Sequence, residues 1–300
     1  MTPPAMTASA SNETTPQPIL VATDLSARSE IAITRALGLA ARRQVPLTIL
    51  HVVDADEPRA LADKQISNAR EFLEETLTAL RGSMQVSAQV VVERGDPFRV
   101  INETAENIGA GLIMMGAHRK NILFDLFRGT TIERVIHTGH TPLLLVNRAD
   151  GETVESAVLG VDPDAHCADA IATAERFGFL DGAVLTAVRA HPDAARLQMT
   201  YAGVDQDTIR RTSSEETQKQ VAEIYAFLAR TALADRDYRL ILEEGEPGQL
   251  LVKVADDLDA DLIVVGTRSL TGLRKVLLGS VTQNVLRQAR CDVLAVPPRG

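Results

Sequence analysis

The sequence predicts an α/β protein of two tandem domains, each a five-stranded parallel sheet with the flavodoxin-like strand order 3-2-1-4-5. Two observations carry this prediction. Short β-branched runs alternate with segments of helical periodicity, and a set of landmark residues recurs along the chain. Gly95-Asp96-Pro97 matches Gly245-Glu246-Pro247, while Gly116 and Gly129 match Gly266 and Gly279, each 150 positions later, as from residue 116 to residue 266. One α/β unit is therefore written twice.

The elements of the first unit follow from these patterns. We expect strands at Ile19–Thr23, Leu47–Val53, Val86–Glu93, Gly111–Met115 and Pro142–Val146, and helices near Ser26–Arg43, Pro58–Arg81, Pro97–Ile108 and Thr130–Thr138. Pro97 and Pro247 each mark a helix start, because the first helical position has no need of a backbone N–H. The second unit is expected to repeat these elements.

The repeat spacing also places the domain boundaries. We expect a disordered tail at residues 1–17, which are polar and proline-bearing, a first domain at 18–149 and a second at 154–298. Asp24 in ILVATD corresponds to Asp162 in AVLGVD, 138 positions later, which is shorter than the spacing of 150 seen downstream. The difference predicts a net insertion in the second unit, and the polar stretch Ala190–Asp237 is the segment where an excursion disturbs no strand.

Composition excludes several classes of function. The net charge of −9 offers no basic field for nucleic acid or anionic lipid, and no apolar run approaches the roughly 20 residues of a membrane helix. Cys167 and Cys291 are the only cysteines, without a CxxC pair, which fits a reducing compartment. No secretory leader pattern is present at the start of the chain. We therefore expect a cytoplasmic protein with neither nucleic acid nor membrane as a partner.

In a doubly wound sheet, ligands bind beyond the carboxyl ends of the strands, where the strand order reverses. The predicted order brings Asp24 toward Gly116 and Asp162 toward Gly266. The helix start at Gly279-Ser280 then presents unpaired N–H groups, which bind anions such as phosphate. The alternative is that Gly279-Ser280 is only a helix boundary. An Asp after a first strand is likewise often a turn residue.

These residues resemble the universal stress proteins, in their tandem two-domain form. The resemblance rests on ILVATDLS, TILHVVD, DLIVVGTRS, GSV and CDVLAVP and spans nearly the whole chain. It implies nucleotide-binding-type domains, ATP as a ligand in many members, and a role in survival under stress. Carried over, the nucleotide-binding residues of the second domain are Asp162, Val188, Gly266, Arg268, Ser269, Gly279, Ser280 and Val281. Those of the first are Asp24, Val52, Gly116, Arg119, Gly129 and Thr130.

Both units depart from the family signature at its second glycine, which is Ser269 in one unit and Arg119 in the other. Serine adds one small polar group, whereas arginine adds a long side chain that fills the crevice or clamps a phosphate. We expect occlusion, and so place ATP in the second domain. The sequence does not say whether Mg²⁺ accompanies it. Members of the family also pair through their final strands, which implies domain–domain pairing of Thr141–Asn147 with Cys291–Pro297. A further homodimer and unidentified protein partners stay open.

Other motifs carry less weight. His137-Thr-Gly-His140 spells the HxGH of nucleotidyltransferases, but it lies before the last strand instead of after the first, so a helix C-cap is expected. The chain has no GxxxxGK[ST], GxGxxG after a first strand, GxSxG or HExxH, and neither a metal nor a catalytic residue is predicted. We interpret Cys167 as a buried small hydrophobe.

The expected function is a non-enzymatic stress-response protein with ATP as a regulatory ligand. The alternatives are a slow ATP hydrolase or nucleotidyl transferase, and a ligand-free interaction scaffold.

Overall fold

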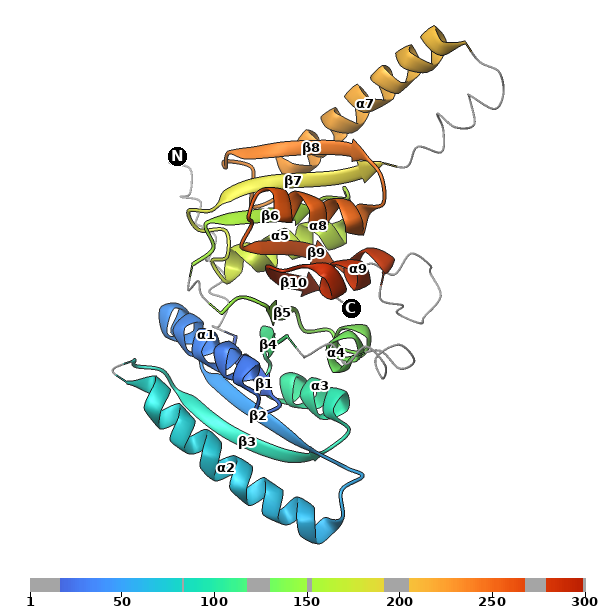
Figure 1. The fold of residues 1–300 in the computed structure, drawn as a ribbon. Coiled ribbons are helices and arrows are strands. Elements are labelled where there is room, and N and C mark those ends of the chain that lie inside the picture. Colours follow the sequence, from blue (N-terminus) through green and yellow to red (C-terminus); the bar gives the residue numbers. More distant parts are fainter. Residues whose placement is uncertain are drawn as a thin grey trace, which may run out of the picture.

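The chain folds into one ten-stranded sheet that contains both units. The computed structural model describes residues 17–82, 84–117, 130–149, 153–191, 205–267 and 279–298. The strand order is β3-β2-β1-β4-β5-β10-β9-β6-β7-β8, so each half has the order 3-2-1-4-5. Figure 1 shows the strands in one column, with α7 at the outer end beyond β8 and α2 at the opposite end beside β3. The predicted fold class is confirmed.

The two units share the same sequence of elements. The first contains β1 Ile19–Thr23, α1 Ala27–Arg43, β2 Leu47–Asp54, α2 Arg59–Arg81, β3 Ala88–Gly95, α3 Pro97–Asn107, β4 Leu112–Gly116, α4 Thr131–Thr138 and β5 Leu143–Val146. The second contains β6 Ser156–Gly160, α5 Ala165–Arg176, β7 Val184–His191, α7 Gln206–Leu228, β8 Tyr238–Glu244, α8 Pro247–Asp257, β9 Leu262–Gly266, α9 Ser280–Gln288 and β10 Asp292–Val296. The predicted elements of the first unit agree to within two residues, as at β3, which begins at Ala88 instead of Val86.

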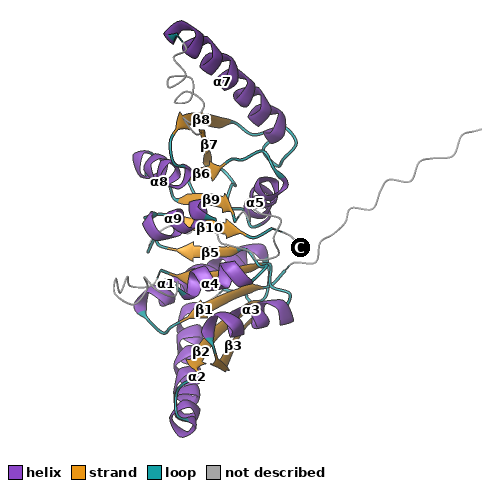
Figure 2. Ribbon diagram, turned by 90° about the vertical axis from the view of Figure 1, so that its right-hand side faces the viewer, coloured by secondary structure: helices purple, strands orange, loops and turns teal. Residues whose placement is uncertain are grey.

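Two hydrophobic cores lie on opposite faces of the sheet, because successive residues of a strand point to opposite sides. Ile19 and Val21 of β1 belong to the core on the side of α1, α2, α5 and α7, whereas Leu20 and Ala22 belong to the core on the side of α3, α4, α8 and α9. The central strands are buried on both sides, which explains their continuous apolar runs. Figure 2 shows helices on both sides of the stacked strands.

The two units join through their final strands. β5 pairs antiparallel with β10, with Val293 opposite Leu145, Leu294 opposite Leu144 and Ala295 opposite Leu143. Leu144 and Leu294 occupy equivalent positions of the repeat, so the pseudo-two-fold axis passes through this pair. β5 and β10 consequently each have a neighbour on both sides, and neither is an edge strand.

The insertion in the second unit lies where the repeat spacing predicts it. Four residues separate Asp54 of β2 from Arg59 of α2, whereas fourteen separate His191 of β7 from Gln206 of α7. A smaller difference follows the helix, with six residues between α2 and β3 and nine between α7 and β8. Most of the insertion therefore precedes α7, where residues 192–204 are outside the described residues.

The predicted tail at 1–17 lies outside the described residues except for Gln17. This residue is held by the second unit, because its Oε1 accepts a hydrogen bond from Arg176 Nη1 at 2.6 Å. Among the described helices, none is long and apolar enough to cross a membrane.

Candidate functional site: two crevices at the strand ends

Each unit has a cavity beyond the carboxyl ends of its first and fourth strands. The cavity of the second unit measures about 360 Å³ and is lined by six of the predicted residues, namely Asp162, Val188, Gly266, Gly279, Ser280 and Val281. The cavity of the first unit measures about 330 Å³ and is lined by Asp24, Val52, Gly116 and Thr130. The predicted residues Arg268, Ser269, Arg119 and Gly129 lie outside the described residues. The topology thus brings distant motifs together in both units.

In the second unit, the helix start that borders the cavity carries no capping side chain. Gly279 is the N-cap of α9, with extended backbone (φ −60°, ψ 143°) and no side-chain oxygen to accept from the first turn. Ser280 follows it and is exposed to solvent. The first N–H groups of a helix have no intrahelical acceptor, and they lie at the positive end of the helix dipole. This helix start is therefore suited to an anion.

In the first unit, the equivalent helix start is capped by its own side chains. Thr130 Oγ1 accepts from the Glu133 N–H at 3.2 Å, and Glu133 Oε2 accepts from the Thr130 N–H at 3.2 Å, which is a capping box. The Glu133 side chain is only 7% exposed, and Arg287 of α9 pairs with it at 2.7 Å. A buried carboxylate thus occupies the N-terminal end of α4.

The sequence carries a signal for this capping box that our sequence analysis missed. Thr130 and Glu133 have the Thr-x-x-Glu spacing of a capping box. At the equivalent position the second unit has Gln283, which bears no charge. The two crevices therefore differ in charge at the same place of the repeat.

Gly116 and Gly266 have a packing role in addition to lining the cavities. A Cβ on Gly116 would lie 2.7 Å from the backbone oxygen of Arg28, and one on Gly266 would lie 3.2 Å from that of His166. Arg28 and His166 are equivalent residues in the first turns of α1 and α5. The glycines permit these helices to approach the ends of β4 and β9. Packing alone thus explains the recurrence of this glycine in both units.

The two aspartates that follow the first strands are held differently. Asp24 Oδ1 accepts from the Ser26 N–H at 3.0 Å, which is a turn interaction next to the N-cap of α1. Asp162 instead pairs with Arg189, with 3.3 Å between Oδ1 and Nη1. The N-cap of α5 is Asp164, which accepts from the Cys167 N–H at 2.8 Å. The second crevice therefore contains an arginine where the first has His51, 138 positions earlier.

The strand register corrects one predicted correspondence. Gly160 of β6 lies opposite Val188, and the equivalent Ala22 of β1 lies opposite Leu50. The counterpart of Val188 is therefore Leu50, the counterpart of Arg189 is His51, and the counterpart of Val52 is Ala190. The segments TILHVVD and LTAVRAH share too few residues to fix this alignment without the register.

Cys167 lies at the base of the second cavity and is buried. Burial raises the pKa of its thiol to about 12, and the nearby carboxylates of Asp164 and Asp162 act in the same direction. The thiol therefore stays protonated at neutral pH and is not a nucleophile. The interpretation of Cys167 as a small buried hydrophobe is confirmed.

The HxGH motif ends a helix. Gly139 is the C-cap of α4, and its N–H donates to Val135 O at 2.9 Å. A Cβ at Gly139 would collide with the Asn102 side chain, so glycine is needed there for close packing. The predicted C-cap is confirmed. Over the described parts of the chain, no group of three or more His, Cys, Asp or Glu side chains is arranged to hold a metal ion.

Fold and crevices define a tandem doubly wound α/β protein with one open and one self-capped helix start. A family model described as the universal stress protein family matches residues 16–147 and 154–297. The chain belongs to this family.

Individual relatives agree with the family assignment. A universal stress protein of Mycolicibacterium smegmatis is 24% identical over 298 residues, which span 94% of this chain and 97% of that protein. One of Methanocaldococcus jannaschii is 49% identical over 53 residues, spanning 18% of this chain and 31% of that protein. The crystal structure of a universal stress protein from Archaeoglobus fulgidus has the same fold, with a TM-score of 0.67 at 19% identity over 93% of this chain and 96% of that one.

Proposed function

We propose that the second unit binds ATP as a regulatory ligand, and that the first unit serves structure or partner binding. The protein then acts in the stress response as a nucleotide-responsive protein without catalytic activity. The observation that carries this proposal is the difference between the two helix starts. At α9 the N-cap is a bare glycine, whereas at α4 the Thr130 and Glu133 side chains take the corresponding hydrogen bonds.

The residues of the second cavity suit a polyphosphate with a nucleoside. The uncapped amides of α9 and the Ser280 hydroxyl are donors to phosphate oxygens. Arg189 brings a guanidinium to the same cavity, and Asp162 holds it in place. Val188 and Leu251 offer apolar surface. A volume of about 360 Å³ lies within the range of small-molecule sites. Bound ATP would add the negative charge that this helix start lacks.

One polar atom at the same cavity has no hydrogen-bond partner. The Nδ1 of His166 is buried and makes no hydrogen bond, and His166 lines the cavity. A buried nitrogen without a partner is costly. A ligand hydroxyl or phosphate oxygen that reached this nitrogen would supply the missing partner.

The assignment without catalysis rests on how the acidic side chains at the cavity are used. Asp164 caps α5, Asp162 pairs with Arg189, and the Cys167 thiol stays protonated. A general base must be free to accept a proton from the attacking group. The described residues that line the cavity therefore provide structural and binding groups.

The test is titration calorimetry of the full chain with ATP, together with analysis of nucleotide released by heat denaturation. We expect one ATP per chain in the wild type and no binding in Gly279→Asp. The backbone angles of Gly279 suit any residue, and aspartate is a good N-cap. This variant therefore keeps the fold and places a carboxylate where the phosphate would bind.

The matched control is Thr130→Asp at the start of α4, which should still bind one ATP because the second crevice is unchanged. Failure of folded wild-type protein to bind ATP overturns the proposal and favours the interaction scaffold. Phosphate release above background that disappears in Gly279→Asp favours the slow hydrolase instead.

A further inference from the structure

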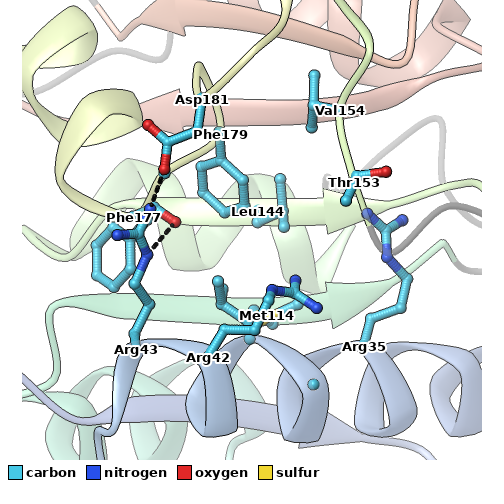
Figure 3. Close-up of a pocket in the computed structure, with 13 residues that line it drawn as sticks. Arg35, Arg42, Arg43, Met114, Leu144, Thr153, Val154, Phe177, Phe179 and Asp181 are labelled. Atoms are coloured by element: carbon cyan, nitrogen blue, oxygen red, sulfur yellow. Dashed lines mark hydrogen bonds and ion pairs between the residues drawn. The ribbon is translucent and has the colours of Figure 1, made fainter.

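A cavity outside both crevices lies between the two units. It measures about 410 Å³ and is lined by Arg35, Gly38, Leu39, Arg42 and Arg43 of α1, Met114 of β4, Leu144 of β5, Thr153 and Val154 of the connection, and Phe177, Gly178, Phe179 and Asp181 after α5. Figure 3 shows Arg43 reaching Asp181 on one side and Arg35 extending toward Thr153 on the other, with Arg42, Met114 and Leu144 between them. We propose that this interdomain cavity binds a small aromatic anion.

The charge of the cavity opposes that of the whole protein. The chain has a net charge of −9, yet three arginines line this cavity, and Asp181 is the one carboxylate among the described lining residues. All three arginines also interact with other groups of the protein. Arg35 pairs with the buried Asp292, and Arg43 donates to Asp181 and to Phe177 O, both at 2.9 Å. With Asp292 counted, the formal charge of the described residues at the cavity is +1, which favours an anion.

Arg35 is more deeply buried than Arg43. Its side chain is 12% exposed, and its buried Nη1 atom forms the ion pair with Asp292. A guanidinium has five N–H donors and binds carboxylate, sulfonate or phosphate oxygens in a planar fork. The N–H groups of Arg35 that do not face Asp292 are the donors available to a ligand oxygen at this wall.

The remaining walls are apolar and aromatic. The rings of Phe177 and Phe179 lie 6.2 Å apart with a tilt of 31°, and Met114, Leu144 and Leu39 complete the apolar surface. Aromatic rings pack well against a planar ring in such geometry. The combination of guanidinium groups with aromatic walls selects an anion with a flat apolar body over an inorganic anion.

The second unit has no arginine at the positions equivalent to Arg35 and Arg42. At the equivalent positions of the second unit, 138 residues later, Arg35 and Arg42 correspond to Thr173 and Leu180. The helix α5 nevertheless packs on the sheet as α1 does, with Ile171 and Ala174 in the core. Packing of this helix on its sheet therefore does not by itself require the three arginines.

The test uses the fluorescent probe 1-anilinonaphthalene-8-sulfonate, an aromatic monoanion, with the full chain. We expect one saturable site per chain in the wild type and a dissociation constant raised about tenfold or more in Arg42→Glu. Arg42 is exposed at the cavity rim, so the variant should fold. The control Arg239→Glu makes the same charge change on the exposed face of β8 and should bind as the wild type does.

Two further measurements exclude nonspecific binding. The uncharged analogue N-phenyl-1-naphthylamine should not distinguish Arg42→Glu from the wild type, because it lacks the anion. Gly279→Asp should bind the sulfonate normally, since its change lies in a different cavity. The proposal is overturned if Arg42→Glu and the wild type bind the sulfonate with equal affinity. It is also overturned if Arg42→Glu weakens binding of the uncharged analogue as much as it weakens binding of the sulfonate.

If Arg42→Glu fails to fold, Phe179→Leu tests the aromatic wall. It should weaken sulfonate binding, and unchanged binding overturns the proposal.

Discussion

The guanidinium of Arg35, on α1 of the first unit, pairs with the carboxylate of Asp292, at the start of the final strand of the second unit. Asp292 is 2% exposed, and its Oδ1 also accepts the N–H groups of Asn147 and Arg148 at 2.9 and 3.1 Å. This buried carboxylate of the second unit therefore binds the Arg35 side chain of the first unit and two backbone N–H groups that follow β5. A second pair, Glu133 with Arg287, joins α4 to α9.

Asp292→Asn should destabilise the protein by about 3–5 kcal/mol, because it leaves the mostly buried Arg35 without its counter-charge. The measurement is the urea denaturation curve of the full chain. Replacing both partners, as Arg35→Met with Asp292→Asn, should recover part of the loss. As a comparison, Asp181→Asn removes the partly exposed pair with Arg43 and should cost about 1 kcal/mol or less. Similar costs for the two single variants would show that burial of Asp292 does not govern the interface.

Glu133→Ala should open the first crevice to ATP. The change removes the buried negative charge and releases the Thr130 N–H, at a cost of about 1 kcal/mol for the lost cap. Calorimetry should then give two ATP per chain instead of one. Gln283→Ala, at the equivalent position of the second unit, is the control and should leave the stoichiometry at one.

Arg119→Ser separates this explanation from occlusion by the long Arg119 side chain. If this variant raises the stoichiometry and Glu133→Ala does not, Arg119 closes the first crevice and the capping box has no part in it.

Arg189→Leu should weaken ATP binding about tenfold, which corresponds to about 1.4 kcal/mol. The change removes the guanidinium that Asp162 holds beside the second cavity. Arg189→Lys should restore part of the affinity, because it keeps the charge but loses the planar fork. His51→Leu changes the equivalent position of the first unit and should have no effect on ATP affinity. An unchanged dissociation constant in Arg189→Leu would exclude Arg189 from the site.

Stability should fall as the pH rises above about 9. Burial raises the pKa of both thiols, Cys167 and Cys291, to about 12. A folded pKa above the unfolded value means that the native state holds the proton more tightly. The stabilising contribution is thus fully present below the unfolded value near 9 and is lost between pH 9 and 12. Each thiol should cost about 2 kcal/mol between about pH 8 and about pH 10.5.

The thiol effect is measured as the difference between wild type and the double variant Cys167→Ala, Cys291→Ala. Other groups titrate in the same range, and this comparison removes their contribution. A parallel loss of stability with pH in both proteins would mean that the thiols have ordinary pKa values in the folded state. Native protein at about pH 8 should also react slowly with Ellman's reagent.

The sequence predicts much of the fold because its signals are local. Alternation of β-branched runs with helical periods places every strand of the first unit, and the spacing of the glycines gives the repeat. The repeat spacing also locates the insertion before α7. The mistaken match of Val188 with Val52 has a different cause, since the register of β7 on β6 depends on hydrogen bonds between strands.

The candidate sites were predictable to different degrees. The Thr130–Glu133 spacing is readable from the sequence, but only the structure shows that Arg287 holds the buried carboxylate. The arginine-lined cavity has no sequence signal. Arg35 and Asp292 are 257 positions apart, and Phe177 and Arg43 meet only after the two units have joined.

The antiparallel pairing of β5 with β10 within one chain has a consequence for how the two halves can evolve. In a dimer of identical chains with two-fold symmetry, each substitution at the interface appears twice. Here both halves belong to one gene product, so a change in one half leaves the other untouched. Arg35 and Asp292 exist once, as does the capping box of α4. Fusion of the two halves therefore lets one of them lose or acquire a binding site while its twin keeps the ancestral one.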